Sequence, residues 1–127
     1  IYDTSKMPTA IIDLNIVSTE FAENHPEAVQ AFLKGIFRAQ EFLQTNPDEA
    51  YAIVAEPLGI QPEEVGEQLQ GVQLPDLEIN LEMMNNPQSD LYLLNALNDM
   101  AEFLQAQGQI DTIPEMSSFV DPQFLST

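Results

Sequence analysis

The sequence predicts a single, mostly α-helical domain with one good β-strand and one weak one. Apolar residues recur at helical spacing along much of the chain, and nine prolines fall mostly at the boundaries of the predicted elements. The 127 residues, 44% of them hydrophobic, have the length of one ordinary domain and enough apolar material for one core. A complete α/β domain normally has several strands, so the predicted sheet lacks partners.

The best predicted strand covers residues 10–17. β-branched side chains dominate this segment, and only Asp13 and Asn15 interrupt it as strongly polar residues. After it, Ser18 is expected to cap a short helix, which ends before Pro26 because a residue that precedes proline is disfavoured in the α conformation.

Three helices are then expected to follow one another with tight joints. The first, residues 26–45, is long and amphipathic, and Gly35 in its middle is expected to permit a close backbone contact. The second starts at the Asn46–Pro47 pair, with acidic residues at the positive end of the helix dipole, and ends at Gly59 in a left-handed cap. The third starts at residue 62 and ends at residue 71.

The last third of the chain has two further predicted elements. Residues 74–81 alternate apolar and polar side chains, which is typical of a short half-buried strand or an extended segment, and Pro75 marks it as an edge piece. A last helix over residues 89–107 is expected to be capped by Ser89 and to end at Gly108. Residues 109–127 have no clear period.

The apolar stripes of neighbouring helices are expected to share one core. Full burial of Phe32 in that core would make its replacement by alanine cost about 3–5 kcal/mol. The expected members are Phe32, Leu33, Ile36, Ile53, Val54, Leu97, Met100 and Leu104.

Composition excludes several classes of function. Three basic residues against 21 acidic ones give a net charge of −18, which repels nucleic-acid phosphates and anionic membrane surfaces. The absence of cysteine excludes disulfides, thiolate metal sites and cysteine nucleophiles, although it leaves the redox compartment open. No apolar run approaches the roughly 20 residues that a membrane-spanning helix needs. The chain begins with Ile1 and is expected to be part of a longer protein.

Isolated polar residues are weak candidates for chemistry. His25 has no second positioned group nearby, which favours a capping or solvated role over catalysis. The acidic groups at the helix starts lack the spacing of a calcium loop and are expected to meet helix dipoles and solvent. Lys34 and Arg38 share one helix face, where pairing with Glu27, Glu41 or another of the abundant acidic residues is favoured over anion binding. No catalytic residue, metal site or cofactor is therefore predicted.

Three motifs occur in a characteristic order: HPE at residues 25–27, NPDEA at 46–50 and DPQFL at 121–125. Together they resemble the carboxy-terminal part of certain ABC-transporter solute-binding proteins. These proteins form the nitrate, sulfonate and taurine group, with thiamine-pyrimidine-precursor-binding relatives. The resemblance implies a type II periplasmic binding fold, an α/β fold in which two lobes hold a ligand between them. This chain, residues 1–127, would be a single carboxy-terminal fragment, with a crossover strand at 1–17, a helical region at 18–108 and a tail at 109–127.

The same resemblance implies a function and a location. The chain would be part of a solute-binding protein, or an appended sensor domain, for nitrate, a sulfonate, taurine or a thiamine pyrimidine precursor. Its partners would be the small-molecule solute and the membrane subunits of an ABC transporter, in the periplasm or an equivalent extracytoplasmic space. A stand-alone helical domain for protein interaction is the alternative. An enzyme that makes a pyrimidine would share the fold, but the sequence does not show its site.

Candidate ligand-binding residues lie in the predicted crossover segment. The hydroxyls of Thr4, Ser5 and Thr9 could donate hydrogen bonds to an oxyanion or a polar ring substituent, and Asp13 could accept from an amine. Ordinary turn-forming and capping roles for these hydroxyls are the alternative. Half of a cleft is expected to bind its solute poorly, and the isolated chain is expected to self-associate through surface that other parts would cover.

Overall fold

The computed structural model describes residues 9 and 11–125. Within these residues helices and connecting segments follow one another, and none of this part of the chain forms a β-strand. The described elements are α1 (Thr19–Asn24), α2 (Pro26–Thr45), α3 (Pro47–Leu58), α4 (Pro62–Leu69), α5 (Leu77–Asn85), α6 (Leu93–Ala106) and the 3-10 helices η2 (Met116–Phe119) and η3 (Pro122–Leu125).

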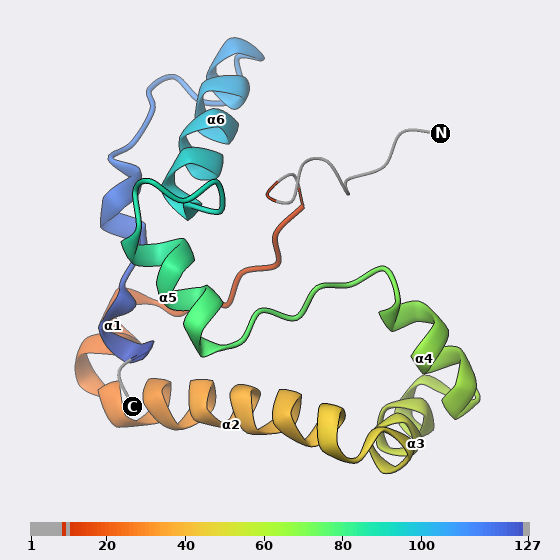
Figure 1. Cartoon of the computed structure of the whole chain (residues 1–127). Helices are drawn as coiled ribbons and strands as arrows, with labels where there is room; N and C mark the ends of the chain where they lie inside the picture. Colours follow the sequence, from red (N-terminus) through yellow and green to blue (C-terminus); the bar gives the residue numbers. More distant parts are fainter. Residues whose placement is uncertain (1–8, 10, 126–127) are drawn as a thin grey trace.

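The long helix α2 joins the two ends of an open arrangement (Figure 1). Helix α1 and η3 pack on α2, and α3 also contacts it and pairs with α4. Helix α5 packs on η3 and on α6, and α6 packs on η2. The carboxy-terminal segment therefore returns to α2 and connects α5 to it through η3.

The molecule exposes much more surface than a compact domain of its mass. Its accessible surface is 9780 Å², whereas a compact monomer of 14.2 kDa exposes roughly 6,800 Å². About 3,000 Å² is therefore in excess of the compact expectation. Several large apolar side chains contribute to the excess, among them Ile16 at 85%, Ile11 at 76% and Phe119 at 68% exposure.

The core is thin and built mostly from small side chains. Its buried members are Val29, Ala50, Ala55, Val65, Leu93, Ala101 and Leu125. Of these, Ala50 and Ala55 lie on α3 and Val65 on α4, where small residues let the two helices approach closely. Leu125 in η3 is buried where the chain returns to α2 and α5.

None of the eight predicted core residues is fully buried, and the prediction is wrong for the four that are exposed. Leu33, Ile36, Leu97 and Leu104 are half-buried, whereas Phe32, Ile53, Val54 and Met100 are exposed. The apolar stripes do exist on their helices, but the open arrangement leaves parts of them without a packing partner. Periodicity identifies which face of a helix is apolar, and it does not show whether another element covers that face.

The helix starts and stops are largely confirmed. Helix α2 has the predicted bounds, and Ser18 Oγ accepts a hydrogen bond from Phe21 N at 3.2 Å, as expected of the cap of α1. Gly59 ends α3 with φ at 68°, in the predicted left-handed conformation. Proline occupies the first position of α2, α3 and α4, where its fixed φ suits the helix and no N–H is needed.

The predicted strand at 74–81 is wrong, because α5 occupies most of it. Asp76 Oδ1 accepts from Ile79 N at 2.9 Å and so caps the helix. The Asn80 amide donates to the carbonyl oxygens of Pro75 at 2.9 Å and of Asp76 at 2.7 Å. These local bonds satisfy backbone groups at the first turn, so a short alternating run becomes helical without a sheet partner.

The predicted strand at 10–17 is not formed in its described part. Residues 11–17 run as an elongated red-orange stretch in Figure 1, and their backbone groups make no hydrogen bond to any other described residue. A strand is defined by its ladder, so β-branched residues alone do not make one.

Two local expectations also need correction. Helix α6 starts at Leu93 and not near Ser89, whose hydroxyl accepts from Leu91 N at 3.1 Å and donates to Glu82 Oε1 at 2.7 Å within a turn. Gly35 permits no close contact, because a Cβ built there meets nothing within 4 Å. The close approach occurs at Gly66, where such a Cβ would lie 3.0 Å from Cε2 of Tyr51.

The core assignment can be tested with a buried and an exposed residue. Leu125→Ala should lower the free energy of unfolding by about 2 kcal/mol, because it opens a cavity where η3 meets α2. Phe32→Ala should cost less than about 1 kcal/mol, because the ring is 53% exposed. Urea denaturation followed by circular dichroism measures both. Equal losses for the two variants would contradict the assignment.

The capping role of Asp76 gives a second test. Asp76→Ala should destabilise the chain by about 1 kcal/mol, because the N–H of Ile79 loses its acceptor. Glu78→Ala, in the same helical turn, removes only a charge near the helix dipole and should cost at most about 0.3 kcal/mol. Thermal unfolding of the two variants compares them. A larger loss for Glu78→Ala would show that charge, and not the cap, stabilises α5.

The two helical glycines give a third test. Gly35→Ala should stabilise the chain by about 0.5–1 kcal/mol, because alanine favours the helix and the added methyl meets no neighbour. Gly66→Ala should gain less, or lose stability, because its methyl would press on the Tyr51 ring. Midpoints of urea unfolding rank the variants, and an equal gain at both sites would contradict the close α3–α4 contact.

Candidate functional site

A shallow groove lies where residues 15–17, α1 and α2 meet. Its volume is about 300 Å³, and its lining residues are Asn15, Ile16, Val17, Phe21, Ala28, Val29 and Phe32. Val29 is buried at its floor, while Phe21 and Phe32 are 44% and 53% exposed. The groove is therefore a surface feature with two aromatic walls, open to solvent.

The local sequence explains why these residues meet. The Ser18 cap starts α1, and Pro26 forces a break after Asn24, so that α1 and α2 pack at a corner. At this corner the His25 and Phe21 rings lie 5.1 Å apart with their planes tilted by 48°. The spacing of Ala28, Val29 and Phe32 puts all three on one face of α2, toward the preceding segment.

The groove suits an apolar surface better than a small anion. Asn15 is the one residue among its lining side chains that carries a hydrogen-bonding group. Across the part of the chain that the structure describes, no polar or charged residue is buried. A small polar ligand needs several convergent donors in a mostly enclosed site, and the described residues do not assemble one.

The four predicted ligand-binding residues are not brought together by the described structure. Thr4 and Ser5 lie outside the described residues. Thr9 is half-buried in a turn, and Asp13 is exposed, and neither lines the groove. Their assignment as ligand contacts stays a prediction.

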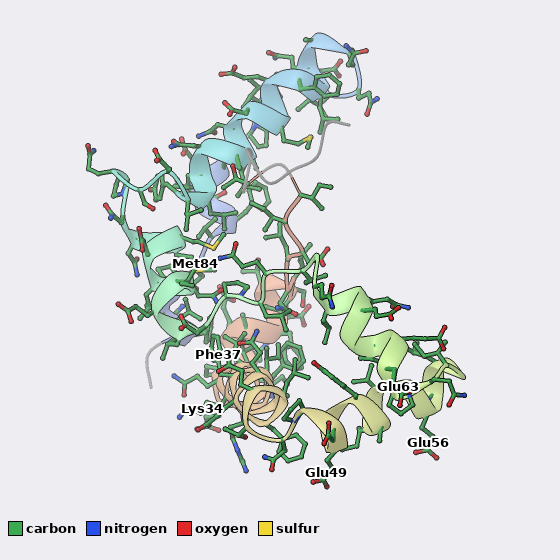
Figure 2. All side chains as sticks on the ribbon, turned by 45° about the vertical axis from the view of Figure 1, so that its right-hand side comes forward. Lys34, Phe37, Glu49, Glu56, Glu63 and Met84 are labelled. Atoms are coloured by element: carbon green, nitrogen blue, oxygen red, sulfur yellow. The ribbon has the colours of Figure 1, made fainter. Side chains whose placement is uncertain are left out.

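The basic pair on α2 differs from its expected role. Lys34 and Arg38 are exposed, and neither lies within 4.0 Å of a carboxylate among residues 9 and 11–125, so the favoured pairing with Glu27 or Glu41 is not formed. Figure 2 shows Lys34 on α2. Helical geometry places both cations on the face opposite Val29 and Phe32, away from the groove.

His25 lies at the joint of α1 and α2 without a capping role for its side chain. Its backbone N–H donates to Phe21 O at 2.8 Å, but the ring makes no capping hydrogen bond to α2. His25 thus occupies the cap position of both helices through its backbone, and its side chain is exposed, in agreement with the expected capping or solvated role. The ring instead packs beside Phe21 at the edge of the groove.

The acidic side chains spread over the helices without forming a metal site among the described residues. Glu49 and Glu56 on α3 and Glu63 on α4 lie at the far end of α2 from the groove (Figure 2). A second, more open hollow of about 410 Å³ lies along the first turns of α5, lined by Asp76, Leu77, Glu78 and Leu81. It also lacks convergent donors, because its polar members are two carboxylates.

The chain has a partial similarity to a solute-binding protein. The chain is 30% identical over 124 residues to the taurine-binding periplasmic protein of Escherichia coli (strain K12). The match covers 90% of this chain and 36% of that protein, so the chain spans about a third of its relative's length. No family model and no solved structure matches the chain. The similarity supports a relationship to a solute-binding protein.

Sequence reasoning identified the residues of the groove only as parts of separate elements. Val29 and Phe32 belong to the predicted stripe of α2, and Ile16 and Val17 to the predicted strand. One feature of the sequence could have shown that these residues meet. The Ser18 cap followed by Pro26 predicts a tight corner between a short helix and the long helix after it. None of the described helices is both long and apolar enough to cross a membrane.

Proposed function

We propose that the chain is part of an extracytoplasmic solute-binding protein that delivers a small solute to the membrane subunits of an ABC transporter. The observation that carries the proposal is the similarity to a taurine-binding periplasmic protein over 90% of the chain. The HPE, NPDEA and DPQFL motifs agree with it, because they span the chain from residue 25 to residue 125 in the order that the resemblance implies. The proposed fold of the whole protein is the two-lobed type II periplasmic binding fold.

The proposed solute is taurine or a chemically related small molecule, such as an alkanesulfonate, nitrate or a thiamine pyrimidine precursor. Of these, taurine has the most direct support, because the relative is described as taurine-binding. The net charge of −18 disfavours long-range attraction of anions. Hydroxyl and N–H donors act at short range inside a cleft, where a surface charge is screened beyond about 8–10 Å.

The open architecture supports the view that the chain forms only one side of such a cleft. The described residues bury no polar side chain, and the surface exceeds that of a compact monomer by about 3,000 Å². In a two-lobed protein the ligand draws its contacts from both sides. The remaining two thirds of a protein as long as the relative would supply the second side and cover the apolar surface.

Binding rather than catalysis is part of the proposal. The His25 ring lies beside Phe21 at an exposed joint, with no second functional group positioned on it in the described structure. General acid–base chemistry needs a positioned proton donor or acceptor in a site that also holds the substrate. Neither hollow on the described surface combines these features.

A helical interaction domain is the second candidate function. The groove between residues 15–17, α1 and α2 favours it, because two exposed phenylalanines could receive the apolar face of a partner. A protein of this class would bind its partner without a small-molecule solute.

Calorimetry with a panel of taurine, alkanesulfonates, nitrate and pyrimidine precursors tests the proposal. The 127-residue chain should bind none of them tightly, because half a cleft buries too little of a small ligand. The product of the complete open reading frame should bind one of them. Micromolar binding by the 127-residue chain alone would contradict the half-cleft argument, and no binding by either protein would favour the interaction domain.

A further inference from the structure

The described helices form two groups that η3 holds together. Helices α1 to α4 are linked by successive contacts of α1 with α2, α2 with α3 and α3 with α4, and α5, α6 and η2 are linked in the same way. Among the described elements, only η3 packs extensively on members of both groups, because it contacts α2 and α5. Figure 1 shows η3 as the dark blue end of the ribbon, beside α2. We call residues 19–69 the first unit and residues 76–119 the second unit.

Each unit buries side chains of its own. The buried residues other than Leu125 are Val29, Ala50, Ala55 and Val65 in the first unit and Leu93 and Ala101 in the second. The start of α5 is also stabilised locally, since Asp76 caps the helix and the Asn80 amide donates to the carbonyl oxygens of Pro75 and Asp76. The helices of the two units therefore have stabilising contacts that do not involve η3.

The contact between η3 and the two units depends on one buried side chain. Leu125 is the buried residue of η3, with 6% of its surface exposed. The turn that leads to it is formed locally, because Asp121 Oδ1 accepts from Gln123 N at 3.1 Å and Pro122 has a fixed φ. Residues 121–125 thus form a short strap with a single apolar anchor.

The other connection between the units is the linker at residues 70–76, and it does not fix their orientation. The amide groups of Gln73 and Leu74 make no hydrogen bond to another described residue. The side chains of Val72 and Leu74 are 53% and 41% exposed. The linker limits how far the units can separate, whereas the strap sets how they pack.

The two units carry the same sign of charge. Ten acidic residues against two basic ones give the first unit a charge of −8, and eight acidic residues with no basic one give the second unit −8 as well. Charges of one sign on neighbouring bodies repel each other, and the repulsion extends further at low ionic strength. The apolar contact of the strap therefore acts against an electrostatic force that separates the units.

We propose that residues 121–125 act as a strap that closes the second unit onto the first, and that release of Leu125 lets the units separate without unfolding. The inference does not depend on the proposed solute, and it rests on contacts that the described residues make. Salt favours the closed state, because screening weakens the repulsion and leaves the apolar contact of Leu125 in place.

Distances between pairs of spin labels test the strap, because the chain has no cysteine of its own. Labels at Ala39→Cys on α2 and Asn85→Cys on α5 report on the distance between the units, and both positions are exposed and uncharged. Leu125→Asp places a charge at the anchor and should release the strap. The distance distribution of this pair should then spread over about 15 Å, the reach of a seven-residue linker.

Two further label pairs and a control substitution separate release from unfolding. The pairs Ala39–Gln68 and Asn85–Asn98 lie within the first and the second unit, and their distributions should not change in Leu125→Asp. Broadening within either unit, or an unchanged Ala39–Asn85 distance, would overturn the proposal. Phe119→Asp introduces the same charge on η2 at a side chain that is 68% exposed, and it should leave all three pairs unchanged. Equal broadening in this control would also overturn it.

Ionic strength tests the balance between the strap and the repulsion. Leu125→Ala weakens the anchor without adding a charge, so its Ala39–Asn85 distribution should be broad at low salt. The screening length falls from about 30 Å at 0.01 M salt to about 8 Å at 0.15 M, and the distribution should narrow over this range. Broadening with added salt would show that ion pairs hold the units together, which would overturn the proposal.

Discussion

Helix α2 is the element on which the arrangement of the chain depends, because α1, α3 and η3 all pack on it. Its twenty residues are long enough to hold the α3–α4 pair at one end while α1 and η3 occupy the other. Val29 is buried where α1 and the groove meet this helix, and η3 connects α5 to it. Much of the tertiary structure therefore rests on the apolar stripe of one helix.

The dependence of several elements on one helix explains why the core is thin. A single helix presents only one stripe to each neighbour, so elements that contact it at different points along its length bury little surface against one another. The α3–α4 contact is close because its buried residues are alanines and a valine and because Gly66 approaches the Tyr51 ring. Such packing holds an element in place but leaves large apolar side chains, such as Phe32 and Ile53, in solvent. Exposed apolar area of this extent is typical of a surface that receives a partner.

The same open architecture bears on the function of the chain. The similarity to a taurine-binding protein covers most of this chain but only 36% of the relative, and the described residues assemble no enclosed polar pocket. Both observations agree with a chain that contributes one side of a ligand site. The groove beside residues 15–17 is apolar. It therefore suits packing against another apolar surface and not the recognition of a small anion.

Local chemistry in the sequence determined most of the helices. The proline-led starts of α2, α3 and α4, the Ser18 cap and the left-handed Gly59 all depend on interactions within a few residues, so they could be predicted. Helix α5 could have been predicted from the Asp76 cap, but its alternating apolar pattern is also that of a strand, and such short runs are ambiguous by periodicity alone. The candidate ligand residues Thr4 and Ser5 lie outside the described residues, and Thr9 and Asp13 carry no contact that assigns them a role.

Only the tertiary structure decided which apolar faces are covered. Phe32 and Val29 belong to the same predicted stripe of α2, yet one is exposed and the other buried, because α1 and the preceding segment reach only part of the helix. Residues 11–17 have the composition of a strand but no partner among the described residues, since strand formation requires hydrogen bonds to a second segment. Burial and strand pairing are properties of two surfaces in contact, and the sequence of one surface does not specify the position of the other.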